Sequence, residues 1–76
     1  MSANNFIRIE KKDGKYIVTE RDADTLRIGY VVGEYDTLSR ANTAAKKEAS
    51  GENNELGIPA EYGVEIDDSC FEEEKI

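Results

Sequence analysis

Hydrophobic and polar residues alternate with a period of two in three stretches of the first half of the chain, at residues 6–11, 16–21 and 25–35. Alternation of this kind predicts β-strands with one buried face and one solvated face. The Asp13-Gly14 pair between the first two stretches is a strong signal for a tight hairpin, and the sequence Asp-Ala-Asp at residues 22–24 turns the chain again. The pattern therefore predicts a three-stranded meander.

The strand faces follow from the same alternation. In the first stretch, Ile7 and Ile9 fall on one face. In the third stretch, the expected core face consists of Leu26, Ile28, Tyr30 and Val32. The expected solvated face consists of Thr25, Arg27, Gly29, Val31 and Tyr35. Glycines inside a strand pattern are typical of bulges or close packing, and we expect that role for Gly29 and Gly33.

After Tyr35 the spacing of apolar residues changes to three and four, which predicts an amphipathic helix that ends near Ala49. Thr37 is the expected N-cap, since its hydroxyl can accept a backbone N–H, and Ser50-Gly51 supplies the C-cap. Arg40 then takes the position where a capping box would have Glu or Gln. The helix is therefore expected to depend on packing against the sheet, through Leu38, Ala41, Ala45 and either Glu48 or Ala49.

The remaining third of the chain is polar and acidic. A connector ends at Pro59, and residues 62–66 alternate like a short fourth strand. We expect residues 67–76 to form a disordered acidic tail. The predicted fold is therefore a single α+β domain over residues 1–66, with the element order β-β-β-α-β. Its antiparallel sheet of three to four strands would have one helix packed on one face.

The net charge of −7 is unevenly distributed. Residues 1–51 carry nine Lys and Arg against eight Asp and Glu, whereas residues 52–76 carry one lysine against nine acidic residues. This balance disfavours binding to nucleic acid, which needs basic side chains against the phosphates, and binding to an anionic membrane surface. The single cysteine, Cys70, and the lack of a secretory signal at the start predict an intracellular protein, cytoplasmic or nuclear.

Catalytic chemistry has little support in the composition. With no histidine and one cysteine, the chain lacks the residues for a tetrahedral zinc site or a histidine-based triad. Acid–base catalysis needs a desolvated carboxyl group with a tuned pKa, but the carboxylates of residues 67–74 lie in a very polar segment. We therefore expect a protein that is not an enzyme and that uses no cofactor or metal.

The stretch VVGEYDTLSRANTAAKKEA, residues 31–49, resembles a group of small, uncharacterised fungal proteins. In that group, a strand ending V-x-G-x-[YF] is followed by [ST]-L-x-x-A-N-x-A-A-K. The residues that carry the resemblance are Gly33, Tyr35, Thr37, Leu38, Ala41, Asn42, Ala44, Ala45 and Lys46. Similar strand–helix patterns occur in many small ββαβ domains. The resemblance implies the fold and a fungal cell, and it implies no activity.

Two local patterns lie near the C-terminus. The segment Val64-Glu65-Ile66-Asp67-Asp68 resembles a minimal SUMO-interacting motif, which adds a strand to the sheet of a partner. The alternative, which the same alternation favours, is an edge strand of this protein's own sheet. Ser69 follows two aspartates and precedes Glu72 by three positions, as in sites for acidophilic kinases of the casein kinase 2 type. A phosphate on Ser69 would repel the neighbouring acids.

Three functional hypotheses follow. The first is a non-enzymatic domain that binds a protein partner through a sheet edge, through its acidic C-terminal third, or through both. The candidate partner-binding residues are Val64, Glu65, Ile66, Asp67, Asp68, Glu72, Glu73 and Glu74. The second is an acidic inhibitor or nucleic-acid mimic that binds a basic cleft, with a strong dependence on salt. The third is a structural protein that self-associates through its sheet, with Ile7, Tyr16 or Tyr62 in the contact. For the protein in general we expect a monomer or a weak homodimer.

Overall fold

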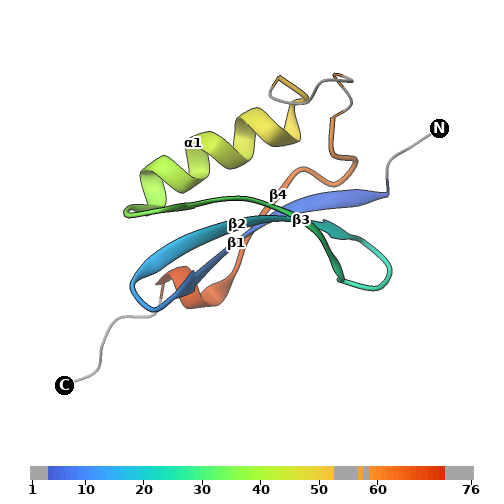
Figure 1. The fold of residues 1–76 in the computed structure, drawn as a ribbon. Helices are drawn as coiled ribbons and strands as arrows, with labels where there is room; N and C mark the ends of the chain where they lie inside the picture. Colours follow the sequence, from blue (N-terminus) through green and yellow to red (C-terminus); the bar gives the residue numbers. More distant parts are fainter. Residues whose placement is uncertain (1–3, 53–56, 58, 72–76) are drawn as a thin grey trace.

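The computed structural model describes residues 4–52, 57 and 59–71, and it shows a four-stranded sheet with one helix across one face (Figure 1). The elements in chain order are β1 (Asn5–Lys12), β2 (Lys15–Asp22), β3 (Ile28–Tyr35), α1 (Leu38–Ala49), β4 (Val64–Ile66) and the 3-10 helix η1 (Asp68–Phe71). The predicted α+β class and the order of the strands and the helix are therefore confirmed.

The strand order is β3-β2-β1-β4, so β3 and β4 are the two edges of the sheet. β1 pairs antiparallel with β2, and β2 pairs antiparallel with β3, as the predicted meander requires. β4, however, runs parallel to β1. The sheet is mixed, and the prediction of a purely antiparallel sheet is wrong in this detail. The reason is that α1 returns the chain across the sheet, which is the connection that parallel strands need.

The turn between β1 and β2 forms at the predicted dipeptide. Asp13 and Gly14 have φ angles of 52° and 77°, and Lys12 and Lys15 are the last paired residues. Two successive positive φ angles are typical of the hairpin turns whose twist matches that of the flanking strands.

β3 begins three residues later than the prediction, at Ile28 instead of Thr25. The Asp22 side chain accepts the backbone N–H groups of Asp24 and Thr25, at 2.8 and 3.0 Å, and Leu26 has a φ angle of 64°. Both features belong to a tight turn and are incompatible with extended backbone.

The predicted faces of β3 are also wrong. Two register shifts between β2 and β3 leave Gly29 and Val32 as extra residues opposite a continuous β2. Each bulge reverses the inside–outside alternation beyond it. As a result, Tyr35 packs against the core together with Val32, whereas the remaining predicted core residues, Leu26, Ile28 and Tyr30, are exposed. The expectation that Gly29 marks a bulge is confirmed.

The core lies between α1 and the face of the sheet that α1 covers. Ile7 and Ile9 of β1 and Val18 of β2 are fully buried, and Ala41 and Ala45 of α1 have no exposed surface. Because alanine ends at Cβ, α1 approaches the sheet closely. Burial of each large aliphatic side chain stabilises the fold by about 1.5–3 kcal/mol.

α1 begins and ends at the predicted caps. The Thr37 Oγ1 accepts the backbone N–H of Arg40 at 3.2 Å. Ser50 is the C-cap, and Gly51 follows with a φ angle of 86°, a conformation that favours glycine. Leu38, which we expected to be the main anchor of the helix, is only partly buried at the margin of the core.

The packed structure continues past Ile66, where we expected the domain to end. The backbone N–H of Asp67 donates to the carbonyl of Ile9 at 2.9 Å, and η1 then places Cys70 in the core. Residues 72–76 of the predicted tail lie outside the described residues. The acidic composition of residues 67–76 concealed the buried cysteine, which anchors the segment to β1.

Candidate functional site

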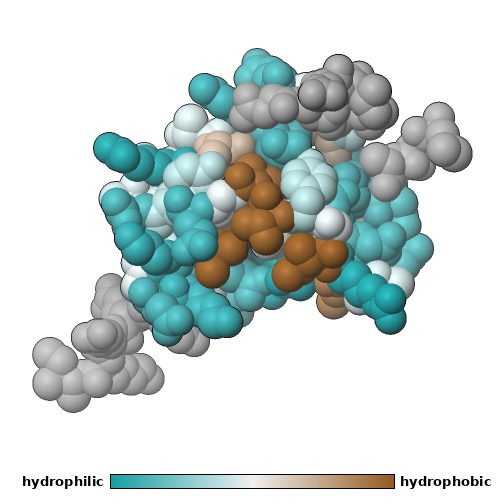
Figure 2. All heavy atoms as spheres, viewed as in Figure 1, coloured by the Kyte–Doolittle hydropathy of each residue, from teal (hydrophilic) through white to brown (hydrophobic). Residues whose placement is uncertain are grey.

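Exposed apolar side chains gather at the β3 edge of the sheet. Leu26, Ile28, Tyr30 and Val31 expose 51%, 51%, 46% and 59% of their surface, and we call these four residues the edge patch. Hydrophobic residues gather over β3, in the middle of the face that Figure 2 shows. β3 is eight residues long, and among the described strands it pairs only with β2. Long, apolar and unpaired edge strands are where another chain can add a strand.

The opposite edge of the sheet is different. β4 has three residues, and its Val64 and Ile66 pack against the core. The segment that resembles a SUMO-interacting motif therefore provides a strand of this protein's own sheet, which is the alternative that we weighed from the sequence. A short edge strand with inward-facing apolar residues offers little to a partner.

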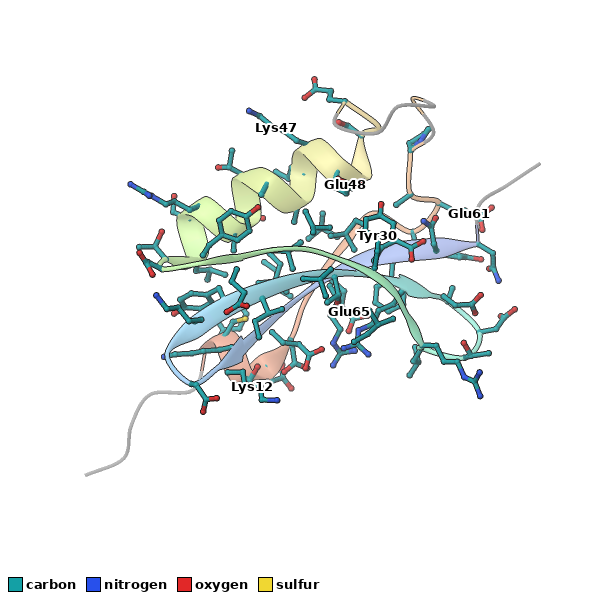
Figure 3. All side chains as sticks on the ribbon, in the orientation of Figure 1. Lys12, Tyr30, Lys47, Glu48, Glu61 and Glu65 are labelled. Atoms are coloured by element: carbon teal, nitrogen blue, oxygen red, sulfur yellow. The ribbon has the colours of Figure 1, made fainter. Side chains whose placement is uncertain are left out.

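Arg8 lies among three carboxylates on the sheet face away from α1, where Figure 3 labels Glu65. The Arg8 guanidinium is 3.0 Å from Glu65 Oε1 and 2.5 Å from Asp67 Oδ1. Its Nε is 3.3 Å from Glu10 Oε1, close enough for an ion pair although the geometry gives no hydrogen bond. Arg21 also pairs with Glu10. We call these five residues the Arg8 cluster.

The predicted partner-binding residues do not form one exposed surface in the part of the chain that the structure describes. Glu65 and Asp67 are engaged with Arg8, Asp68 is exposed, and Glu72, Glu73 and Glu74 lie outside the described residues. Partner binding by this set stays a prediction.

The residues that we suggested for a self-association contact also differ in their exposure to solvent. Ile7 is only 1% exposed and Tyr16 packs against the core, whereas Tyr62 is 62% exposed. In the folded chain, Ile7 is therefore not available for a contact between two copies.

Ser69 helps to hold η1 against β1. Its Oγ accepts the backbone N–H of Lys11 at 3.1 Å, and its own backbone N–H donates to Asp67 Oδ2 at 3.1 Å. The hydrogen bonds from Ser69, together with Arg8, lower the pKa of Asp67 from its ordinary value of 3.8. Phosphorylation of Ser69 stays a prediction, and it would place a phosphate on the oxygen that accepts the N–H of Lys11.

Cys70 lies in surroundings that disfavour reactivity. Burial, followed by the charge of Asp67, raises the pKa of its thiol, and the thiolate is the nucleophilic form. Within residues 4–52, 57 and 59–71, no three His, Cys, Asp or Glu side chains form a group that could hold a metal ion.

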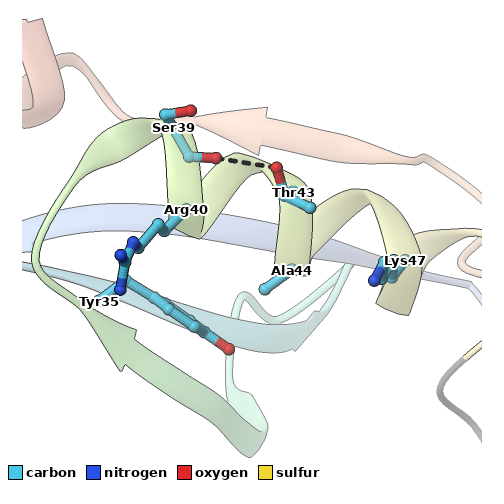
Figure 4. Close-up of a pocket in the computed structure, with 6 residues that line it drawn as sticks. All are labelled: Tyr35, Ser39, Arg40, Thr43, Ala44 and Lys47. Carbon is cyan, nitrogen blue, oxygen red and sulfur yellow. Dashed lines mark hydrogen bonds between the residues drawn. The ribbon is translucent and has the colours of Figure 1, made fainter.

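A groove of about 460 Å³ lies along α1 beside the end of β3 (Figure 4). We call it the α1–β3 groove, and its lining residues are Tyr35, Ser39, Arg40, Thr43, Ala44 and Lys47. Positions 40, 44 and 47 of a helix lie on one flank. The groove therefore offers two cations and several hydroxyl groups, with Ala44 between them.

Two carboxylates beside the groove, those of Glu48 and Asp36, have partners. Tyr30 Oη donates to Glu48 at 2.6 Å, a contact that joins β3 to the last turn of α1 (Figure 3). Burial, together with this hydrogen bond, raises the pKa of Tyr30. Asp36, which precedes the helix, forms an ion pair with Lys15. In the part of the chain that the structure describes, neither Arg40 nor Lys47 has an ion-pair partner.

The sequence analysis missed the edge patch and the α1–β3 groove. Alternation alone assigned most of the patch to the core, because it does not show where a bulge reverses the faces. Two signals could have indicated these surfaces. Gly29 marked a possible bulge, and Arg40 opposes the helix dipole at the N-terminus of α1. A residue that conflicts with its local element often serves another purpose.

Among the described helices, none is long and apolar enough to cross a membrane. Comparison of the chain with protein-family models, with curated proteins and with solved structures found no match.

Proposed function

We propose that this protein is a non-enzymatic interaction domain that binds an extended segment of a protein partner along the outer edge of β3. The observation that carries the proposal is the exposure of the edge patch on a long edge strand, whose outer side has no paired strand among the described residues. The partner would be another protein inside the cell, and neither nucleic acid nor a membrane is the proposed target.

Strand addition suits the chemistry of this edge. The partner's backbone would pair with the free N–H and C=O groups of β3, and its side chains would point alternately to the two faces of the sheet. Ile28 and Val31 provide exposed apolar surface on the face away from α1, since they pair with Arg21 and Thr19 of β2. After the bulges at Gly29 and Val32, residues 33–35 pair with β2 without interruption. This end of β3 lies beside the α1–β3 groove.

An acidic inhibitor or nucleic-acid mimic has less support. Such a mimic needs free carboxylates, and two of those in the acidic third are paired with Arg8 at 3.0 and 2.5 Å. A second copy of this chain could also bind along the β3 edge. Such self-association would appear as a dimer in sedimentation.

Affinity capture from a lysate with three forms of the protein tests this proposal. Val31→Lys places a charge in the edge patch, and Phe71→Lys is the matched control, because Phe71 is an exposed apolar residue of η1, at 62%. We expect the partner to be lost with Val31→Lys, and to be retained with wild type and with Phe71→Lys. A partner that still binds Val31→Lys would contradict the proposal.

A further inference from the structure

We propose that the segment bound by β3 is acidic, with carboxylate or phosphate groups on alternate residues that point into the α1–β3 groove. This inference rests on the proposed strand addition at β3 and names the chemistry of the bound segment. Its basis is the pair of cations, Arg40 and Lys47, that line the groove beside that strand.

The geometry fits alternate residues of an added strand. Tyr30 and Tyr35 lie on the α1 side of β3, since Tyr30 bonds Glu48 and Tyr35 lines the groove. Every second side chain of an added strand would take the same side, with a spacing of about 6.8 Å. Arg40 and Lys47 are seven helical positions apart, or about 10.5 Å along the axis. The side chains of Arg40 and Lys47 are long enough to bend toward each other and reach two groups that lie about 6.8 Å apart.

The local charge favours an acidic segment although the whole chain is acidic, with a net charge of −7. Asp36 pairs with Lys15, and Glu48 keeps its charge but is engaged by a hydrogen bond from Tyr30. Figure 4 shows Arg40 beside Tyr35 at one end of the groove and Lys47 at the other end. A guanidinium binds a carboxylate or a phosphate through two parallel hydrogen bonds. The hydroxyl groups of Tyr35 and Ser39 can donate further ones, whereas that of Thr43 donates to the Ser39 carbonyl.

The other face of the added strand would meet different side chains. Ile28 and Val31 are exposed on the side away from α1, so the intervening residues of the segment should be apolar. The recognised pattern is therefore an extended segment in which acidic and apolar residues alternate.

Three labelled peptides test this pattern by fluorescence anisotropy: one that alternates Val and Glu, one that alternates Val and Thr, and one that alternates Val and Lys. Each matches β3 in length, at eight residues. The proteins are wild type, the double variant Arg40→Glu and Lys47→Glu, and Lys46→Glu. Lys46 is the matched control, because it is an exposed lysine of α1 that does not line the groove.

We expect wild type to bind the Val/Glu peptide at least about tenfold more tightly than the Val/Thr peptide, a difference of about 1.4 kcal/mol. The double variant should reverse this order and prefer the Val/Lys peptide, and its circular dichroism spectrum should match that of wild type. Lys46→Glu should behave like wild type. A phosphoserine in place of each Glu then shows whether carboxylate or phosphate binds better.

Two outcomes would overturn the inference, and they separate it from the proposed function. If the Val/Thr and Val/Glu peptides bind wild type equally tightly, and the double variant also binds both equally tightly, β3 adds a strand without a preference for acidic residues. If no peptide binds and the amides of β3 do not respond to any of them in NMR spectra, strand addition itself is wrong.

Discussion

Arg8 is the residue on which the uncovered face of the sheet depends. Its side chain is 21% exposed and contacts carboxylates from β1, β4 and the residue that follows β4. Exposed ion pairs contribute little to stability. A partly buried arginine shared by three carboxylates is different, since its loss leaves Glu65 and Asp67 without their ion-pair partner.

Replacement of Arg8 by Ala should therefore lower the free energy of unfolding by about 1–2 kcal/mol. The matched control is Arg27→Ala, which removes an exposed arginine that is not part of the Arg8 cluster. Urea denaturation of both variants measures the difference. An equal loss of stability in the two variants would show that the Arg8 cluster contributes nothing specific.

Asp67 should make stability depend on pH. Hydrogen bonds from Ser69, together with Arg8, lower the pKa of Asp67 in the folded state from 3.8. Its unfolded state then binds the proton more strongly, so the stabilisation is complete above that ordinary value and is lost as the pH falls through the folded-state pKa. Wild type should be more stable than Asp67→Asn at neutral pH, and this difference should shrink in acid. A difference that stays constant down to low pH would contradict this role of Asp67.

At the scale of elements, α1 has a favourable N-cap residue, Thr37, but an unfavourable residue at the third helical position, Arg40, whose charge opposes the helix dipole. Thr37 caps the helix through Arg40 N–H, and Thr37→Ala should cost about 0.5–2 kcal/mol, with Thr37→Ser close to wild type. Thermal unfolding followed by circular dichroism measures both. Stability of Thr37→Ala equal to that of wild type would show that the cap is replaced by solvent.

Arg40→Glu should separate stability from binding. A Glu at this position can complete a capping box and complement the helix dipole, although its charge would also approach Asp36. We expect the variant to be at least as stable as wild type and yet to bind the Val/Glu peptide more weakly. Equal stability together with unchanged binding would remove Arg40 from the proposed site.

β3 and α1 show how far the sequence determines these elements. The caps, the small-residue stripe and the Asp13-Gly14 turn depend on local chemistry, and the sequence predicted them correctly. The faces of β3 depend on two bulges in its pairing with β2. Such register shifts depend on contacts between distant residues, which single-strand alternation does not contain. The candidate site lies on β3, and for that reason it could not be predicted from the sequence.

At the scale of the whole molecule, the residues after β4 complete the fold. Cys70 is buried, and η1 is held to β1 through Ile9 and Lys11. A chain that ends at Ile66 should be less stable than one that ends at Phe71, by about 2 kcal/mol or more, since it loses a buried side chain and several hydrogen bonds. Denaturant unfolding of the two chains measures this difference. Equal stability would mean that η1 only rests on the sheet.

The most direct test of strand addition at β3 is amide hydrogen exchange, measured by NMR for the free protein and with the tightest-binding of the three peptides. We expect new protection of amides in β3, between residues 28 and 35, with little change in β4, because a strand added at that edge would use the free N–H groups of β3. Protection confined to β4 or η1, or binding without any protection in β3, would contradict the proposed mode of binding.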